Sequence, residues 1–443
     1  MAKALPGPSM WATTRALLPT PYRALPTFLA ATAAQYGPVS TFALPWRRFV
    51  FVNDPEAIKA VFVTQQHAFV KSEGVRTLRI LLGEGLLTSE DPLHRKMRRI
   101  VQPAFHHARI GAYGVTMLEH AREFVAGLHD GETFDMHTAM SELTLKIAGS
   151  TLFGADTADQ AQAVRDALHE TMDVFPGAIG PIGKLRRRLP LASTRRFERA
   201  RATLDAIVYG LIAERRRSAS ERGDALSLLL AAGEAEGADR PSDEQIRDEV
   251  MTLFLAGHET TANALTWTWY LLALHPEVVE RLRAESAGMD FSADPFALLA
   301  ALEYTTRVVK EAMRLYPPAW IIGRQALADV ELLGRYPIPG GATVLISPLV
   351  LQRTPSLYPR ALEFDPDRWN DGEGIPFAYV PFGGGARRCI GEAFAWMEAT
   401  LLLAYIARSF TFARTPGPDI RIDPLVTLRP KGPMLVQATK QTA

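Results

Sequence analysis

The sequence predicts a mainly α protein with a small β-rich region, and three observations support this fold class. Apolar residues recur at three- and four-residue spacing across most of 94–288, as in amphipathic helices. Ser242 to Leu274 has the pattern of one unusually long helix. Strand-like segments are short and gather in two places. We expect a single domain over 1–443, with the β-rich part at about 38–53 and 320–370 and the helical core at about 94–316 and 389–410.

The first predicted element is a hairpin. Pro38 to Ala43 and Arg48 to Val52 alternate or run apolar on either side of a Leu44-Pro45-Trp46 turn, which is typical of two paired strands. A short helix is expected next, from Pro55 to Val61.

The helical part follows. Breaker residues separate periodic segments, of which the clearest are Met136 to Leu152, Gln162 to Phe175 and Arg195 to Arg217. The long helix is expected to start at a capping box made by Ser242 and Gln245 and to stop at His275-Pro276, a length of about 50 Å at 1.5 Å per residue. After a loop-rich stretch we expect a last helix from Gly391 to Phe410 and strand-like pieces near Leu425 to Leu428.

Composition and charge exclude several classes of function. The chain has 443 residues, 47% of them hydrophobic, and a formal net charge of +1, so no polyanion-binding surface is expected and nucleic acid is not a predicted partner. Val250 to Leu274 is long enough to span a bilayer, but His258, Glu259 and Asn263 at its middle would be costly in lipid. No signal peptide or transmembrane anchor fits the proline-rich start. We expect a soluble, cytoplasmic monomer.

The chain contains one cysteine, Cys389. A single cysteine excludes an internal disulfide, an iron-sulfur cluster held by this chain alone and a multi-cysteine zinc site. Without context the simplest interpretation is a buried small hydrophobe. Here Cys389 follows a glycine-dense turn and precedes a helix, whose N-terminus should lower the thiol pKa and favour a metal-binding thiolate. A phosphate-binding loop is excluded because no Lys-Ser/Thr pair follows the glycines.

The segment around Cys389 resembles the haem-binding loop of the cytochromes P-450, through Phe382, Gly385, Arg387, Cys389 and Gly391. The resemblance implies heme b with the Cys389 thiolate as axial ligand of the iron. It also implies the cytochrome P-450 fold, a triangular helical domain with a long central helix over the haem.

A second motif lies upstream of the loop. Glu311 and Arg314 are three residues apart on one predicted helix, Leu302 to Tyr316, and could pair. An isolated pair of this kind is usually a weak surface contact. Arg368 lies in a segment that resembles the one from which the family supplies an arginine to this pair. The resemblance therefore implies that Glu311, Arg314 and Arg368 form a buried, structural ion network. Trp369 stands where the family more often has phenylalanine.

A third motif, Ala256 to Thr261, resembles the family's oxygen-activating motif on the long helix. Gly257 weakens the helix by about 1 kcal/mol relative to alanine, and the Thr260 hydroxyl can bond a carbonyl one turn back. We therefore expect the helix to open locally, with Thr260 and Glu259 as proton donor and relay. His258 is assigned to packing.

Further cations match the positions that bind the haem propionates in this family. These are His94 and Arg98, four residues apart on one helix face, together with Arg324 and Arg387. His94 replaces the commoner tryptophan. Taken singly, each could equally be a solvated surface residue.

The implied activity is a haem-thiolate monooxygenase that inserts one oxygen atom of O2 into a C–H bond or alkene of a hydrophobic small molecule. The implied partner is an external electron donor, a ferredoxin or flavodoxin with its NAD(P)H reductase. A basic dock for it could be formed by Arg95, Lys96, Arg99 and Arg388, although a merely solvated face explains these residues equally well.

Two alternatives stay open on the sequence. One is a peroxide-driven or oxygen-independent haem-thiolate enzyme, and the other is a non-enzymatic haem sensor or carrier-recruiting module. Both would be expected to lack the Glu259-Thr260 pair, which is present. The substrate could be a fatty acid, terpenoid, steroid or macrolide. By resemblance the pocket is lined by the loop before His94, by the region 175–193, and by Leu255, Ala256, Ala319, Trp320, Ile321, Ile322, Leu425 and Val426.

Overall fold

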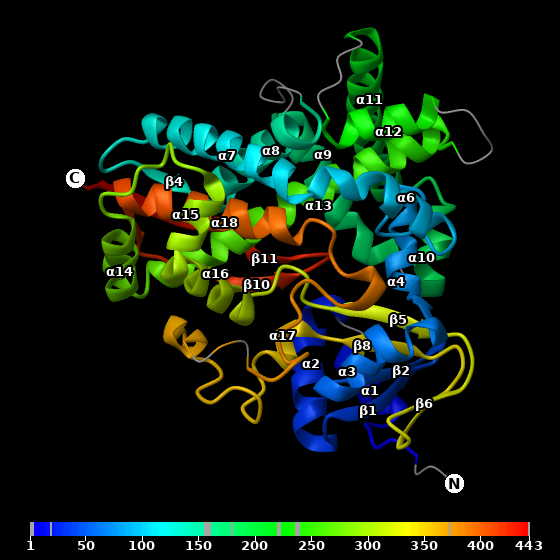
Figure 1. Cartoon of the computed structure of the whole chain (residues 1–443). Helices are drawn as coiled ribbons and strands as arrows, with labels where there is room; N and C mark the ends of the chain where they lie inside the picture. The colour runs from blue at the N-terminus through cyan, green and yellow to red at the C-terminus, as the bar shows by residue number, and fades with distance from the viewer. Residues whose placement is uncertain are drawn as a thin grey trace.

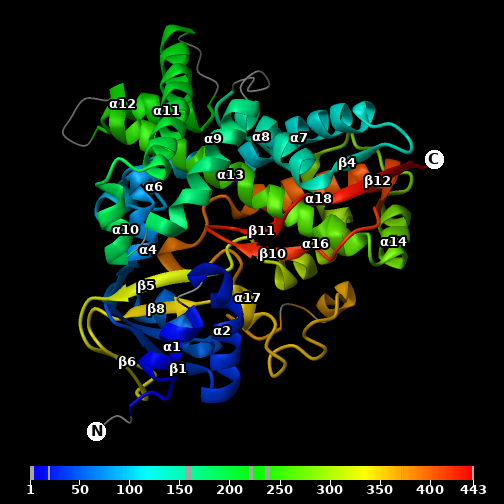
Figure 2. The same cartoon turned by 180° about the vertical axis from the view of Figure 1, so that it is seen from behind.

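The computed structural model describes residues 4–17, 20–154, 161–178, 180–218, 223–234, 240–370, 372 and 374–441. Helices form the larger part of the molecule, and a five-stranded sheet with the N-terminal helices forms the smaller part below it (Figure 1). The same division is visible from behind (Figure 2). The predicted class, mainly α with a small β-rich region, is confirmed.

The helices have the following bounds: α1 Met10–Leu17, α2 Pro21–Tyr36, α3 Pro55–Lys59, α4 Glu73–Thr77, α5 Arg79–Leu82, α6 Leu93–Val101, α7 His107–Gly127, α8 Met136–Leu152, α9 Ala161–Val174, α10 Gly180–Arg187, α11 Ala192–Ser218, α12 Ala225–Glu234, α13 Asp243–Leu272, α14 Pro276–Ser286, α15 Pro295–Ala301, α16 Glu303–Leu315, α17 Pro348–Leu351 and α18 Glu392–Ser409.

The strands are β1 Val39–Leu44, β2 Arg47–Val52, β3 Phe69–Lys71, β4 Thr133–Asp135, β5 Ile322–Ala326, β6 Val330–Leu332, β7 Tyr336–Ile338, β8 Thr343–Ile346, β9 Phe410–Arg414, β10 Arg421–Pro424, β11 Leu428–Lys431 and β12 Leu435–Lys440.

The long helix α13 crosses the helical part of the molecule. Its capping box is formed as predicted, with the Ser242 hydroxyl accepting from the Gln245 amide at 3.2 Å and the Gln245 side chain accepting from the Ser242 amide at 3.0 Å. Most of its residues are buried, because α8, α16 and α18 pack around it. Among the described residues, no helix is both long and apolar enough to cross a membrane.

The predicted hairpin is confirmed as β1 and β2, paired from Val39 with Val52 to Leu44 with Arg47. The five strands lie in the order β1-β2-β8-β5-β3, in which only β2 and β8 run parallel. The pairing of β3 with β5 sets Lys71 opposite Arg324. Two residues that are far apart in sequence are thereby brought side by side.

Three details of the sequence prediction differ from the structure. The helix from Pro55 ends at Lys59 and continues as a turn of π-helix, Ala60–Thr64. The strands of the second β-rich segment end at Ile346, and 347–370 contains a short helix, α17, and loops. Leu425 to Thr427 form the turn between β10 and β11, because the Leu425 amide bonds to the Asp423 and Thr427 carbonyls across the turn.

Candidate active site around Cys389

The loop that carries Cys389 is held against the π-helical turn at Ala60–Thr64. Gly385 has a φ of +66°, and a Cβ there would lie 1.7 Å from the Phe62 carbonyl oxygen. Only glycine fits that position, because it tolerates positive φ and has no side chain. The Cys389 amide then donates to the Phe382 carbonyl at 3.0 Å, just before α18 begins.

The Cys389 side chain is accessible, unlike most of the core around it. It is still enclosed by enough protein that burial raises the pKa of its thiol to about 11, against the opposing effect of the Gly391 amide. The Gly391 amide at the helix N-terminus does lower this pKa, as the sequence predicts, but desolvation outweighs it in the polypeptide by itself. A metal ion that binds the sulfur would displace this proton directly.

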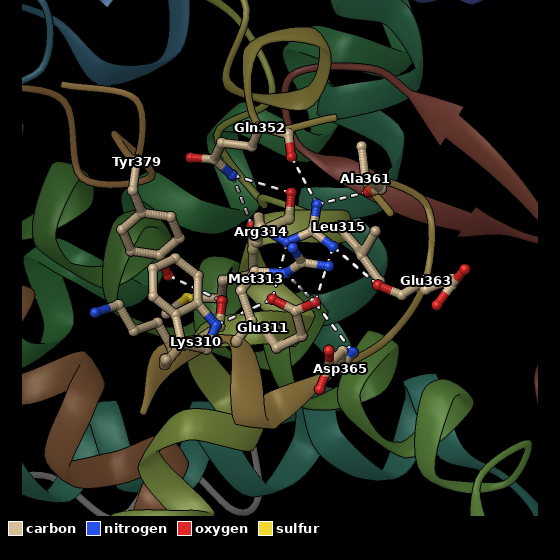
Figure 3. Close-up of polar contacts among 12 residues, drawn as sticks. Lys310, Glu311, Met313, Arg314, Leu315, Gln352, Ala361, Glu363, Asp365 and Tyr379 are labelled. Carbon is tan, nitrogen blue, oxygen red and sulfur yellow. Dashed lines mark hydrogen bonds and ion pairs between the residues drawn. The ribbon is translucent and has the colours of Figure 1, made fainter. Parts of the chain in front are cut away.

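Beneath the loop, Glu311 and Arg314 on α16 form a fully buried ion pair. Arg314 donates to both Glu311 oxygens at 2.8 Å (Figure 3). The Nε of Arg368 donates to Oε1 of Glu311 at 3.3 Å. The remaining Arg314 protons go to the carbonyls of Gln352, Ala361 and Glu363 at 2.6 to 3.0 Å. With its donors satisfied in this way, a buried guanidinium is tolerated.

Two further contacts extend this network, and the sequence did not reveal them. The indole Nε1 of Trp369 donates to Glu311 at 3.0 Å, a bond that phenylalanine at this position could not make. The Gln352 side chain donates to the Met313 and Arg314 carbonyls at 3.1 Å and accepts from the Val380 amide at 3.0 Å. Gln352 therefore links α16 to the segment that enters the Cys389 loop.

On α13, Thr260 and Ala256 occupy an accessible position within an otherwise buried helix. Ala256 is exposed although its neighbours in sequence are largely buried, and the Thr260 hydroxyl donates to the Ala256 carbonyl at 2.8 Å. The predicted local opening does not interrupt α13, which runs unbroken through Gly257. Leu152 of α8 packs 3.2 Å from where a Gly257 Cβ would stand, so the glycine here permits close helix packing.

Glu259 does not contact Thr260. Its Oε1 accepts from Arg429 at 2.7 and 2.8 Å and from the Thr427 hydroxyl at 2.5 Å, both near the C-terminal hairpin. Burial opposes ionisation of this carboxyl, but the Arg429 charge prevails and holds its pKa below the ordinary value. In the observed conformation Glu259 is therefore a carboxylate, able to accept a proton but without one to donate.

His258 lies on the opposite side of the helix from Thr260. Its Nδ1 is 3.2 Å from the Phe254 carbonyl, and its own carbonyl accepts from Thr144 of α8 at 3.1 Å. Burial lowers the pKa of its imidazole and so favours the neutral form. These contacts agree with a packing role.

The predicted propionate-binding cations lie together, with one more cation that the sequence analysis missed. Arg387 donates to Glu90 at 3.0 Å, Arg98 donates to the Arg388 carbonyl at 2.9 Å, and His94 is buried 3.6 Å from Asp91. Lys71, buried beside Arg324 through the β3–β5 pairing, completes the group. We call Lys71, His94, Arg98, Arg324 and Arg387 the cation group.

The members of the cation group repel one another. Burial lowers the pKa of Arg324 to about 10 and that of His94 to about 3, and in both the Arg387 charge lowers it further. Such a cluster is stabilised by an anion with more than one carboxylate. The haem propionates meet this requirement, so the cation group and the accessible Cys389 sulfur fit the group that the sequence predicted.

The predicted pocket residues divide into two sets. Ala256 is exposed, and Ala319, Ile321, Ile322 and Val426 are partly accessible. Trp320 is fully buried, and its indole donates to the Leu425 carbonyl at 2.9 Å while packing on Leu349 and Leu428. Trp320 therefore belongs to the core, where its indole N–H has a hydrogen-bond partner. Its predicted place in the pocket lining is wrong. Leu255 and Leu425 are also largely buried.

Comparison with known proteins identifies the family of the chain. The family model described as Cytochrome P450 matches residues 6–437. A protein named cyclooctatin synthase from Streptomyces melanosporofaciens is 39% identical over 408 residues, covering 90% of this chain and 88% of that protein. Cyclooctat-9-en-7-ol 5-monooxygenase from the same organism is 36% identical, covering 88% and 85%. Pentalenene oxygenase from Streptomyces avermitilis is 35% identical, covering 84% of each.

These matches cover nearly the whole chain, and the names of two of these relatives describe oxygenation. The activity is that of a haem-dependent monooxygenase that inserts one oxygen atom of O2 into a small-molecule substrate and receives electrons from an external redox partner. The chain belongs to the cytochrome P450 family.

Proposed function

We propose that Cys389 is the axial thiolate of a heme b and that the enzyme oxidises a polycyclic terpenoid. The observation that carries the first part is the position of an accessible Cys389 next to a loop whose arginine, Arg387, belongs to the cation group. Sulfur ligation and carboxylate binding are then provided by residues of the same loop, Cys389 and Arg387.

Within this proposal each residue has a defined task. Arg98, Arg324 and Arg387 bind the propionates by charge-assisted hydrogen bonds, supported by His94. Phe382 shields the sulfur, while Gly385 and Gly391 let the backbone approach a flat ring system. The haem, when bound, activates O2. The Glu311, Arg314 and Arg368 network keeps the loop in position.

Proton delivery is assigned to the accessible face of α13. The Thr260 hydroxyl can turn from the Ala256 carbonyl and donate a hydrogen bond toward O2 in the site. Glu259 acts as a relay only after its carboxylate has separated from Arg429, since the bound form carries no proton. Arg429 therefore controls when Glu259 can serve Thr260.

A terpenoid is favoured among the four substrate classes that the sequence left open. The accessible lining residues Ala256, Ala319, Ile321, Ile322 and Val426 are aliphatic, so they suit a hydrocarbon framework without charged groups. The named relatives carry cyclooctatin, cyclooctat-9-en-7-ol and pentalenene in their names. We extend that chemistry to this chain.

The electron donor is proposed to be an acidic ferredoxin or flavodoxin with its NAD(P)H reductase. Arg95 and Arg99 are exposed on α6, next to the cation group, and Lys96 is partly exposed. Arg388 is exposed beside Cys389 and pairs with Glu392 at 2.7 Å. A monomeric state and a cytoplasmic location stay predictions of the sequence.

The test of haem ligation is the spectrum of the reduced protein with carbon monoxide. A thiolate ligand gives a red-shifted Soret band, and Cys389→Ser should abolish it while α-helix content is preserved. Absence of the band in the wild-type protein, or its survival in Cys389→Ser, would disprove the assignment.

The substrate class is tested separately, by spectral titration with polycyclic sesquiterpenes and diterpenes beside a fatty acid, a steroid and a macrolide. We expect the terpenoids alone to displace water from the iron at micromolar concentration. Binding of another class in preference to them contradicts the substrate proposal and leaves the haem assignment intact.

A further inference from the structure

The C-terminal end of α16 is buried, and its last carbonyl groups need hydrogen-bond partners. Met313, Arg314 and Leu315 are all shielded from solvent. The Ala312 carbonyl still accepts from the Tyr316 amide at 2.7 Å, but the last carbonyls of a helix have no partner inside it. Because a buried, unpaired carbonyl is costly, the three remaining ones must be bonded from outside the helix.

Two adjacent residues after α17 supply these bonds through their side chains. The Nε2 of Gln352 donates to the Met313 and Arg314 carbonyls, both at 3.1 Å (Figure 3). The Nε of Arg353 donates to the Leu315 carbonyl at 2.8 Å. The end of α16 is therefore capped by a segment that is distant in the sequence.

Gln352 also connects this helix end to the Cys389 loop. Its Oε1 accepts from the Val380 amide at 3.0 Å. The Val380 carbonyl accepts from the Gly383 amide at 3.1 Å, and the Phe382 carbonyl accepts from the Cys389 amide at 3.0 Å. A short series of hydrogen bonds thus leads from one side chain to the residue that carries the sulfur.

The Gln352 side chain is itself held rigidly. It is completely buried, and both protons of its Nε2 and its Oε1 are used in hydrogen bonds. Its backbone carbonyl accepts from Arg314 at 2.7 Å, so both its side chain and its backbone bind α16. A side chain fixed in this way holds the Val380 amide at a defined place relative to the ion pair of Glu311 and Arg314.

We propose that Gln352 is a positioning residue that fixes the Cys389 sulfur relative to α16, by joining the capped helix end to the Val380 amide. This inference rests on the proposed function, in which Cys389 is the axial ligand of the haem iron. Groups behind a metal ligand keep it in place, and their loss typically weakens metal binding about 10- to 100-fold. Loss of the Gln352 amide should therefore loosen the bond between thiolate and iron without changing Cys389 or the cation group.

The experiment follows the reduced carbon monoxide complex of the Gln352→Met holoenzyme during mild heating. Methionine is similar in length but has neither the donors nor the acceptor. We expect the red-shifted Soret band to convert to an unshifted band about 10- to 100-fold faster than in the wild-type protein, while α-helix content is preserved.

Arg353→Met is the matched control. Arg353 caps the same helix end and lies 4.8 Å over the Tyr316 ring, and its bond to the Leu315 carbonyl lies outside the Cys389 loop. Both variants should unfold at a lower urea concentration than the wild-type protein. Only Gln352→Met should also lose the red-shifted band faster, which a general loss of stability would not produce.

Hydrogen exchange of the Val380 amide tests the connection without a ligand. In the holoenzyme it should be about tenfold faster in Gln352→Met, because the acceptor is gone, and unchanged in Arg353→Met. If Gln352→Met does not fold, Gln352→Asn decides instead. Its shorter amide cannot reach both α16 and Val380, so it should still lose the band faster than Arg353→Met.

The two possible failures are distinguishable. A wild-type protein without the red-shifted band refutes the haem assignment and this inference with it. If the wild-type protein has the band, and Gln352→Met keeps it equally long or Arg353→Met loses it equally fast, Gln352 does not position the sulfur and the haem assignment stands.

Discussion

Arg429 of the C-terminal hairpin binds the carboxylate of Glu259 on the central helix at 2.7 Å, across 170 residues of sequence. The pair is buried, and it separates Glu259 from the neighbouring Thr260, with which the sequence motif had grouped it. Glu259 is recognisable from the local motif Ala256 to Thr261, but its ionisation depends on Arg429, which lies far from that motif in the sequence.

Arg429→Met should destabilise the protein by about 3–5 kcal/mol, because it leaves a buried carboxylate unpaired. The wild-type pKa of Glu259 lies below 4.5, so its contribution to stability is present above that pH and is lost as the pH falls. In the variant the pKa should rise above 4.5, and stability should instead decrease as the pH rises. Urea unfolding between pH 3 and 8 measures both slopes.

The double variant Arg429→Met with Glu259→Gln is the control, since no charge remains to be buried. It should recover much of the lost stability. Equal stability of the single and double variants would contradict the charge argument.

Trp369→Phe should cost about 1–3 kcal/mol, because it removes the indole donor from a buried Glu311 oxygen. The matched variant is Trp269→Phe, whose indole nitrogen is buried without a hydrogen-bond partner among the described residues. There we expect a smaller loss, which comes from packing alone. If the order is reversed in urea denaturation, the Trp369 bond does not carry the stability assigned to it.

Thr260→Ala should uncouple electron use from product formation, because the hydroxyl that positions the proton is removed. We expect NAD(P)H consumption to continue while product falls by about 10- to 100-fold and hydrogen peroxide increases. Thr261→Ala, one residue along on the same helix, should remain mostly coupled. Fully coupled turnover by Thr260→Ala would remove its proposed role.

Arg99→Glu should slow electron transfer from an acidic donor protein, because it reverses one charge of the proposed dock on α6. The wild-type rate should fall with rising salt, and the variant should be slower and less sensitive to salt. Arg199→Glu, on the exposed side of α11, controls for a general change in net charge. An electron-transfer rate that changes neither with salt concentration nor in Arg99→Glu would refute the proposed dock.

Individual helices, caps and hairpins were predictable because the residues that specify each of them are close together in the sequence. The Ser242 capping box, the β1–β2 hairpin and the Met136–Leu152 helix each depend on residues within a few positions of one another. Trp320 shows the limit. From the sequence alone, a tryptophan could line a pocket or lie in the core. The hydrogen bond from the Trp320 indole to the Leu425 carbonyl, about a hundred residues away, places it in the core.

Cys389 and its glycine turn, recognisable in the sequence alone, determined the family and the chemistry, because a lone cysteine in that context has few interpretations. The tertiary structure decided the protonation states. The Cys389 thiol, Glu259, His94 and Arg324 all have pKa values set by burial and by charges brought from other elements. Desolvation and Coulomb forces depend on distance in space, which the order of residues along the chain does not specify.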